Sequence, residues 1–236
     1  MSLAATRFIA VLLSVVAVGV LLALGAQKLF GAAVGADAEL ITRLKQSEKS
    51  GLTLPIPGAK DPLVARSHRY DRFTPWLDPG SGALMMDTTL EFSGRLGQVE
   101  VGGFTSEKLV FRQVDGDWEP VEGYAPSLTA VVKALQARRA AVEQLDLRRL
   151  DALRLEAGTR PAPALDGQEL QFLAQLRNRS YNVKAWYIRA EPDEAIVTED
   201  YRLTGDLPDR PVDHQGSRRL TLKRSGGEFF FSPGIM

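Results

Sequence analysis

The chain begins with a long apolar segment, nineteen residues from Phe8 to Ala26 that include no charged side chain. Crossing about 30 Å of hydrocarbon takes roughly 20 apolar residues at about 1.5 Å each. Leu29 and Phe30 extend the run. The sequence therefore predicts a transmembrane anchor from Phe8 to Phe30, in contact with the lipid bilayer, behind an N-terminal tail of residues 1–7. A buried core helix is the alternative interpretation.

The fate and the orientation of this segment are separate questions. A secretory signal has a shorter apolar region followed closely by a small-x-small site. The one acceptable site, residues 34–36, lies well beyond the apolar run, so an uncleaved anchor is favoured over cleavage after Ala36. Lys28 and Arg43 follow the segment and Arg7 precedes it, and counting basic residues would place the body in the cytoplasm. The short leader favours export, so we expect a single-pass protein of the bacterial inner membrane whose body is periplasmic or otherwise extracytoplasmic.

Composition limits what the rest of the chain does. Most of the 236 residues lie beyond the anchor, enough for one large domain or two smaller ones. Twenty-nine basic residues balance 29 acidic residues, so no net charge attracts the protein to nucleic acid. Charged residues at 25% and apolar residues at 44% indicate globular folding and exclude wholesale disorder. Without cysteine there is no disulfide framework or thiolate metal site.

The first part of the body has a helical pattern followed by strand patterns. Apolar residues at alternate positions predict a strand, and Asp115-Gly116 between two apolar runs predicts a hairpin turn, because both residues tolerate positive φ. The expected elements are a helix at 36–49, a loop at 51–62, strands at 84–96 and 98–101, and a hairpin at 107–121.

The second part has helices first and strands afterwards. Ser127 is expected to cap a long amphipathic helix, with its apolar stripe on one side and Lys133, Arg138 and Arg139 largely on the other. The further expected elements are helices around 147–153 and 170–176 and strands at 183–190, 195–203, 218–223 and 228–231. Helices followed by strands indicate an α+β fold with an antiparallel sheet, not a parallel α/β fold.

Sliding the chain along itself until Gly116 falls on Gly227 superposes the two strand-rich regions without a gap. This displacement, here called the repeat shift, pairs 89–96 with 200–207, 108–111 with 219–222, and Tyr70 with Tyr181. Strand, turn and hairpin keep one register over about fifty residues, which predicts a duplication. The opening helix of the second copy matches the C-terminal half of the membrane segment.

The second copy resembles the nuclear-transport-factor-2-like family, also called SnoaL-like or cystatin-like. The resemblance rests on the order of the elements and on Ala141, Asp146 and Leu150 within residues 134–153. It implies a curved antiparallel sheet wrapped around helices as a cone, complete over 126–236 and degenerate over 36–125. The family includes isomerases, dehydratases, small-ligand binders and membrane-tethered secretion-system scaffolds, so the fold leaves the function open. Its enzymes commonly place an Asp after the second helix, where this chain has Glu156.

Few residues are candidates for chemistry. Trp186, Tyr187, Asp200 and Tyr201 lie on two expected strands and are candidates to line a cone, or simply to form core and surface. His68 and His214 are the only two histidines. His214 follows Asp213 in an expected loop, where the pair is either half of an acid/base site or solvated surface.

No phosphate-binding loop, nucleophile elbow or zinc-protease motif occurs, so we expect no cofactor and no metal. The Arg-Arg pairs at 138–139, 148–149 and 218–219 are interpreted as solvated faces, not as a nucleic-acid surface.

These features favour a non-catalytic scaffold or accessory subunit of a bacterial envelope complex, anchored in the membrane and acting through a protein partner. A small-ligand-binding or isomerase/dehydratase-like enzyme that uses the cone of the second module is the alternative. A polar cavity containing Asp200 or Glu156 would favour the enzyme. A cone filled with side chains and an exposed apolar patch would favour the scaffold.

Overall fold

The computed structural model describes residues 37–153 and 167–232, and all structural statements concern these residues. Those up to Arg43 belong to one compact unit, and those from Leu44 onward form another. Residues 37–50 are helical, as predicted for 36–49. Within the described part of the chain, no helix is both long and apolar enough to cross a membrane. The predicted anchor from Phe8 to Phe30 lies outside that part.

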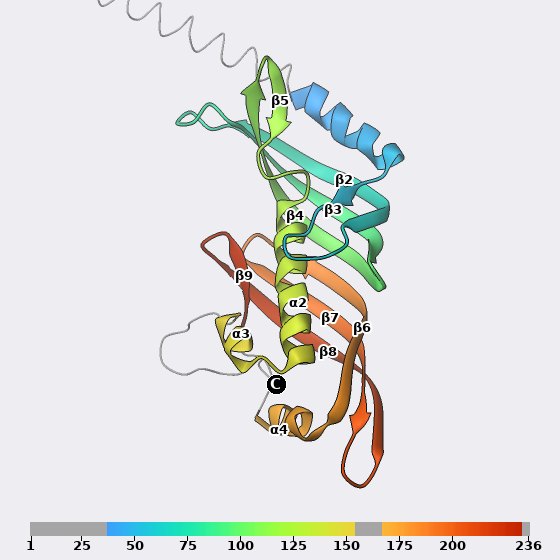
Figure 1. The fold of residues 1–236 in the computed structure, drawn as a ribbon. Helices are drawn as coiled ribbons and strands as arrows, with labels where there is room; N and C mark the ends of the chain where they lie inside the picture. The colour runs from blue at the N-terminus through green and yellow to red at the C-terminus, as the bar shows by residue number, and fades with distance from the viewer. Residues whose placement is uncertain (1–36, 154–166, 233–236) are drawn as a thin grey trace, which may run out of the picture. The chain divides into compact units, whose positions relative to one another are not determined.

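Residues 44–125, here called the first half, form five strands (Figure 1). These are β1 (Thr53–Leu54), β2 (Leu63–Leu77), β3 (Leu84–Leu96), β4 (Val99–Val114) and β5 (Asp117–Pro120). The predicted bounds of β3 are confirmed. The sequence pattern missed β2, divided β4 into two pieces, and assigned β1 to a loop.

Residues 126–232, here called the second half, contain three helices and then four strands, which confirms the predicted order. The elements are α2 (Pro126–Gln144), α3 (Leu147–Ala152), α4 (Gly167–Gln175), β6 (Arg177–Ala190), β7 (Glu194–Asp206), β8 (Pro211–Ser225) and β9 (Glu228–Phe231). β8 begins at Pro211 and not at 218, so Asp213 and His214 lie on a strand and the predicted loop at this position is wrong.

All nine strands join one sheet, in the order β1-β2-β3-β4-β6-β7-β8-β9, with β5 paired to β4. The expected antiparallel pairing holds within each half. Between the halves, β4 and β6 pair in parallel, from Glu100 opposite Ala185 to Thr105 opposite Ala190. The chain reaches β6 through the helices of the second half, and such a long crossover is what a parallel pair needs.

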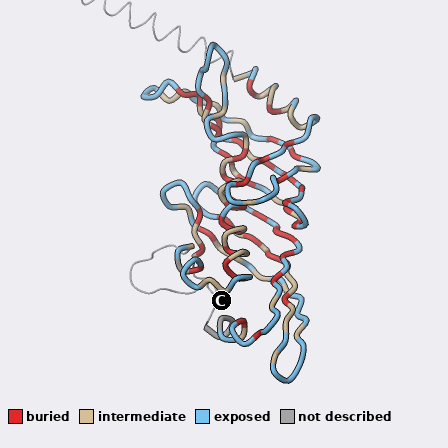
Figure 2. The backbone as a smooth tube through the Cα atoms, viewed as in Figure 1, coloured by how far each residue is buried: buried red, intermediate tan, exposed pale blue. Residues whose placement is uncertain are grey.

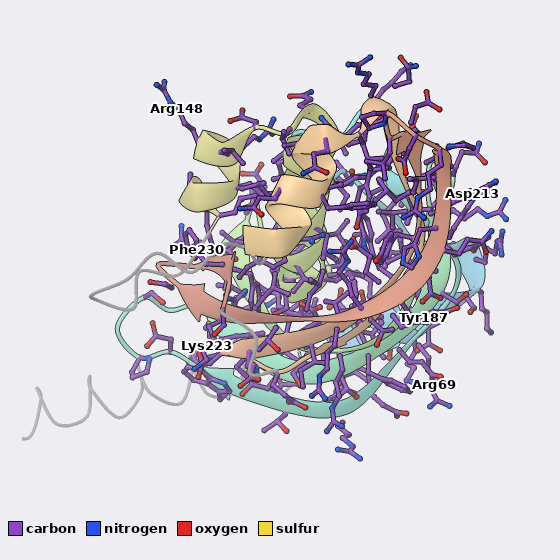
Figure 3. All side chains as sticks on the ribbon, turned by 90° about the horizontal axis from the view of Figure 1, so that it is seen from below. Arg69, Arg148, Tyr187, Asp213, Lys223 and Phe230 are labelled. Atoms are coloured by element: carbon purple, nitrogen blue, oxygen red, sulfur yellow. The ribbon has the colours of Figure 1, made fainter. Side chains whose placement is uncertain are left out.

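The sheet is strongly curved, and its inner face wraps around the helices (Figure 3). Burial alternates along the strands, as expected for a sheet with one covered face (Figure 2). In β3 the alternate residues Leu84, Met86, Thr88, Leu90 and Phe92 are all buried. The alternation in the sequence therefore predicted the covered face of this strand correctly.

Helix α2 packs against β4, β6 and β9 and against α3, so it contacts strands of both halves. Its apolar stripe is buried as predicted: Leu128, Val131, Val132, Leu135 and Val142. The helix starts at Pro126, whose fixed φ suits a first helical position, and ends at Leu145 in the left-handed conformation. Because one helix covers strands from both halves, its attachments link the two.

The strands of the two halves pair in the same register, and this common arrangement is here called the strand frame. Leu84 lies opposite Phe111 in the β3–β4 pair, and Ala195 lies opposite Leu222 in the β7–β8 pair. The repeat shift places Leu84 on Ala195 and Phe111 on Leu222, so the β3–β4 pair and the β7–β8 pair have equivalent registers under this shift. β5 and β9 keep it as well, and each follows a turn in which Gly116 or Gly227 has a positive φ.

The repeat shift fails for one pair of strands. Tyr70 lies opposite Leu90, whereas Tyr181 lies opposite Leu203, the counterpart of Phe92. Tyr181 therefore corresponds to His68, and β6 is out of step with β2. The connection after β2 is longer than the one after β6, which accounts for the change. The predicted match of Tyr70 with Tyr181 is wrong for this reason.

The junction between the halves depends on a glycine. Gly103 on β4 has a φ of 139°, and a Cβ added there would lie 1.8 Å from the carbonyl oxygen of Ile188 on β6. Its neighbour Gly102 has room, because an added Cβ would lie 3.6 Å from the nearest atom. The parallel pairing thus requires glycine at 103 and tolerates a side chain at 102.

Candidate functional site

A fully buried carboxylate, Glu199 on β7, lies on the inner face of the second half. Its Oε1 accepts hydrogen bonds from Arg138 Nη1 at 2.9 Å and from the hydroxyl of Tyr181. Arg218 Nε lies 3.3 Å from the same oxygen, and Trp186 Nε1 donates to Oε2 at 2.9 Å. Four side chains from α2, β6 and β8 therefore converge on one acid of β7.

Burial pushes the pKa of Glu199 upward, but Arg138, Arg218 and the donated hydrogen bonds outweigh it and hold the pKa below its ordinary value. The carboxylate is consequently ionised at neutral pH. Burial also raises the pKa of Tyr181 above its ordinary value, and the nearby Glu199 charge adds to this, so the phenol stays protonated and donates. Breaking a buried pair of this kind typically costs about 3–5 kcal/mol.

A pocket of about 550 Å³ lies beside this cluster. Arg218 borders both, because its Cζ lies 4.1 Å from the ring centroid of Tyr201, a geometry that suits a cation–π contact. The Tyr201 ring in turn lies 5.9 Å from the ring of His214. The described side chains that line the pocket are apolar, aromatic or basic: Phe172, Leu173, Tyr181, Tyr201, Leu203, Arg210, Pro211, Val212, His214 and Arg218.

The structure brings two of the four predicted cone-lining residues together. Trp186 is fully buried on the Glu199 cluster, and Tyr201 borders the pocket. Tyr187 is 56% exposed and points away from the helices (Figure 3). Asp200 follows Glu199 on a strand, so it faces the outer side. Tyr187 and Asp200 therefore do not line the cone.

The charged residues of the cluster, Arg138 and Glu199, were not predicted from the sequence. The sequence predicts Arg138 on the polar face of α2, but the side chain is only 1% exposed, so this prediction is wrong. It lies three residues after the buried Leu135, within the apolar stripe, and that spacing was the available signal. Glu199 likewise follows Val197 on the inner face of β7. A charged residue in an apolar register indicated a buried pair.

The other paired arginines behave differently. Arg148 and Arg149 are exposed, as predicted, and Arg148 projects from α3 (Figure 3). Arg219 is exposed as well, whereas the Arg218 side chain is only 16% exposed. The solvated-face interpretation of the pair at 218–219 therefore holds for one member only.

Asp213 and His214 point to opposite faces of β8. Asp213 pairs on the outer face with Arg202, whose Nε lies 2.7 Å from Oδ1 and whose Nη2 lies 2.5 Å from Oδ2. These hydrogen bonds hold the pKa of Asp213 below its ordinary value. His214 borders the pocket without Asp213, so the two residues do not form an acid/base pair.

A second buried carboxylate, Glu107 on β4, holds the start of α2. It accepts hydrogen bonds from the backbone amides of Ser127 at 2.7 Å and Leu128 at 3.0 Å, and from the Thr105 hydroxyl at 2.6 Å. Ala125 is the N-cap residue, so the predicted capping by Ser127 is wrong: Glu107 supplies the acceptor from another strand. Burial raises the pKa of Glu107 to about 7, against these hydrogen bonds.

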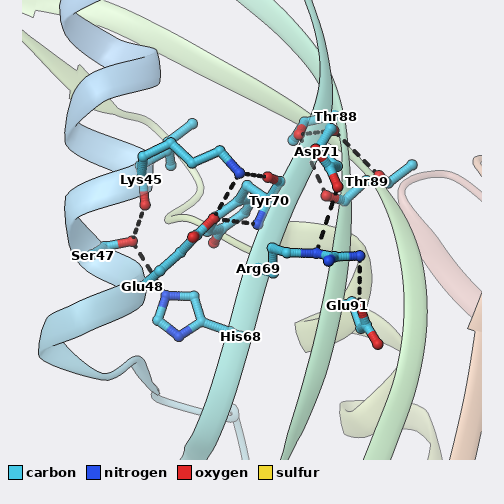
Figure 4. Close-up of polar contacts among 11 residues, drawn as sticks. Lys45, Ser47, Glu48, His68, Arg69, Tyr70, Asp71, Thr88, Thr89 and Glu91 are labelled. Atoms are coloured by element: carbon cyan, nitrogen blue, oxygen red, sulfur yellow. Dashed lines mark hydrogen bonds and ion pairs between the residues drawn. The ribbon is translucent and has the colours of Figure 1, made fainter.

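His68 lies on β2 beside the helical residues 44–50 (Figure 4). Its Nε2 lies 3.2 Å from the hydroxyl of Ser47, but that hydroxyl donates to the Leu44 carbonyl oxygen at 2.6 Å. The imidazole must then be the donor in the pair, so it is not a base for Ser47. Burial lowers the pKa of His68, although Glu48 opposes this, which keeps the ring neutral.

Glu48 and Lys45 satisfy the backbone of Tyr70 at the outer edge of β2 (Figure 4). Glu48 Oε1 accepts from the Tyr70 amide at 2.8 Å and from Lys45 Nζ at 3.1 Å. Lys45 also donates to the Tyr70 carbonyl oxygen. These contacts are structural, because they complete the hydrogen bonding of an edge strand.

Among the described residues, no group of three or more His, Cys, Asp or Glu side chains could hold a metal ion. Glu156, which the family pattern made a candidate, lies outside those residues. The site that remains is the pocket together with the Glu199 cluster beneath it. It can bind a ligand through basic and aromatic side chains.

No model of a known protein family matches the chain, and no curated protein matches it. It is similar to the solved structure of a candidate ketosteroid isomerase from Shewanella frigidimarina, with a TM-score of 0.37 and 17% identity, over 43% of this chain and 90% of that one. It is also similar to a candidate dehydratase of the nuclear-transport-factor-2-like family from Streptomyces avermitilis, with a TM-score of 0.36 and 17% identity, over 46% and 97%. The fold class, α+β with a large curved sheet, rests on the elements described above.

Proposed function

We propose that this chain is a non-catalytic accessory subunit of a bacterial envelope complex, anchored in the inner membrane from Phe8 to Phe30 and acting through protein–protein contacts. The length and apolarity of that segment support the anchor. The two halves with one strand frame support a scaffold made of tandem nuclear-transport-factor-2-like modules, of which the first is incomplete.

The main support for a non-catalytic role is the state of Glu199. A general base needs an accessible lone pair and a pKa near the working pH. Both oxygens of Glu199 already accept hydrogen bonds, its side chain is fully buried, and its pKa is below the ordinary value. Glu199 therefore serves to hold α2 through Arg138 and has no free lone pair directed at the neighbouring pocket.

The anchor and its orientation are tested with alkaline phosphatase, an enzyme that is active only after export, fused to Met236. We expect an active fusion that stays with the membrane fraction. A matched fusion without residues 8–30 should be expressed and inactive. An inactive full-length fusion at equal expression would move the body to the cytoplasm and contradict the envelope assignment.

A small-ligand-binding or isomerase/dehydratase-like enzyme is the second candidate, and the pocket of about 550 Å³ favours it. A thermal-shift screen of small carboxylates, steroids and other metabolites on the full chain in detergent separates the two candidates. A compound that raises the Tm of the natural chain, but not that of Tyr201→Ala, would favour a ligand binder. Turnover of such a compound would contradict the non-catalytic proposal.

A further inference from the structure

β8 has a long unpaired edge. On one side it pairs with β7 along its whole length, from Pro211 opposite Asp206 to Lys223 opposite Glu194. On the other side β9 pairs only with residues 222–225 of β8, and the amide of Ser232 donates a hydrogen bond to the Thr221 carbonyl oxygen. In the described part of the chain, residues 211–220 therefore have no strand on this side. Such an edge is a template for another strand.

The equivalent edge in the first half is occupied. β4 and β8 have the same register, so residues 100–105 of β4 correspond to 211–216 of β8. Residues 100–105 are the segment that pairs in parallel with β6. In the first half this edge segment therefore pairs with a parallel strand. In the described second half, the equivalent residues 211–216 have no strand beside them on this edge.

The pocket lies along the same part of β8. Val212 and His214 line it, and Arg210 stands just before the strand. Arg210 has no side-chain partner among the described residues, and no Asp or Glu is present among the described lining residues. A carboxylate entering here meets the Arg210 guanidinium and aromatic rings, while the nearby Glu199 carboxylate is already paired with Arg138 and Arg218.

We infer that the β8 edge is a docking site for an extended segment of a partner protein, which adds a parallel strand at residues 211–216 and inserts an acidic side chain into the pocket. This inference rests on the proposed function, because it names how the protein–protein contact is made. Main-chain hydrogen bonds along the edge supply affinity, and the pocket supplies the preference for an acid.

A second copy of the chain is the competing occupant, since β2 is the counterpart of β6. Matched through their partners in β7 and β3, residues 185–190 of β6 correspond to 71–77 of β2. There Arg72 has a φ of 56° within the irregularity at Asp71–Thr74, which interrupts the ladder, and Pro75 removes an amide inside the segment, whereas Pro211 stands at the end of the β8 edge. The β2 edge is therefore unsuited to pairing, and the occupant is a different protein.

His214 stands where β4 has Gly103, so the added strand lies in a regular geometry. The clash at Gly103 arises from its φ of 139°. His214 is not among the residues with positive φ, and its side chain turns toward the pocket. A strand beside 211–216 then needs no glycine in β8.

The test is a selection of random octapeptides, displayed on phage, against the full chain in detergent. Enriched peptides should carry one Asp or Glu within an alternating apolar pattern. For a synthesised binder, Arg210→Ala should weaken binding about tenfold, and Arg219→Ala, on the outer face, should leave it unchanged. Two N-methylated versions of the peptide should differ. Methylating the alternate amides that face β8 should abolish binding, and methylating the other set should leave it unchanged, a result that pocket binding alone does not give.

Three outcomes would overturn the inference: no enrichment, enriched peptides without an acid, or equal binding of both methylated forms. Self-association of the chain that is lost on Gln215→Pro would assign the edge to a second copy instead. The selection uses purified protein, so it does not depend on the membrane orientation that the phosphatase fusion tests. The two proposals therefore fail separately.

Discussion

Glu107 on β4 and Arg218 on β8 occupy the same place in two strands of equal register. Glu107 lies opposite Thr88 and binds the first amides of α2, whereas Arg218 lies opposite Glu199 and contacts its carboxylate. Each half thus holds α2 through one buried acid: Glu107 at the start of the helix, and Glu199 through Arg138 further along.

The raised pKa of Glu107 makes folding depend on pH. Below pH 4.5 the acid is protonated in both states; between pH 4.5 and about 7 only the unfolded chain loses the proton, so stability falls as pH rises. Over this window we expect a loss of about 3 kcal/mol from this group. Glu107→Gln keeps an acceptor for one of the two amides, removes the titrating group, and should flatten that part of the profile. The check is urea unfolding of both proteins from pH 4.5 to 8, where equal slopes would contradict the raised pKa of Glu107.

Arg138→Leu should be severely destabilising because it leaves a buried carboxylate with one partner fewer. We expect a loss of about 3–5 kcal/mol in the free energy of unfolding. Adding Glu199→Gln to Arg138→Leu should recover part of it, since the unpaired charge is removed. Arg139→Leu, the neighbouring arginine with no partner among the described residues, is the matched control and should change stability by less than about 0.5 kcal/mol. An equally small change in the free energy of unfolding for Arg138→Leu and Arg139→Leu would mean that both side chains lie on the surface.

Gly103→Ala should weaken the junction between the halves. The new Cβ meets the Ile188 carbonyl at 1.8 Å and the residue has a φ of 139°, so β4 and β6 must separate locally. A loss of about 2 kcal/mol or more is expected, against less than about 1 kcal/mol for Gly102→Ala. Thermal unfolding followed by circular dichroism compares the two. A benign Gly103→Ala would mean that the strands are not in close contact there.

Glu48→Ala should expose the β2 edge. Tyr70 is fully buried, and its amide loses the acceptor 2.8 Å away, which costs about 1–3 kcal/mol. Lys49→Ala, on the exposed side of the same helix, serves as the control. Hydrogen exchange at the Tyr70 amide gives a direct measurement: it should accelerate in Glu48→Ala alone, and unchanged protection would mean another acceptor.

Local pattern was enough to predict much of the fold. Strict alternation located β3 with its bounds, and the apolar stripe located α2. β2 escaped because bulges at Ala65–Ser67 and Asp71–Thr74 break its alternation. The parallel pairing of β4 with β6 was not predicted, because it depends on which strand edges meet after a long crossover, and no local residue pattern determines that.

The site was less predictable. Trp186 and Tyr201 were found because aromatics on adjacent strands often share a face, but Tyr187 and Asp200 lie one position away, on the other face. Arg138 is buried only because Glu199 comes from a strand far along the chain. A helix pattern taken alone assigns an arginine to solvent, and the partner that reverses this is visible only in three dimensions.

The common frame, the attachment of α2 and the free β8 edge all depend on the parallel junction of β4 and β6. The chain has no cysteine, so disulfide formation reports the register directly. Phe104 lies opposite Arg189, and we expect Phe104→Cys/Arg189→Cys to oxidise to near completion within the monomer. Phe104→Cys/Thr198→Cys, with β6 between the two sites, should stay reduced. A crosslink in the second pair, or none in the first, would contradict the continuous sheet.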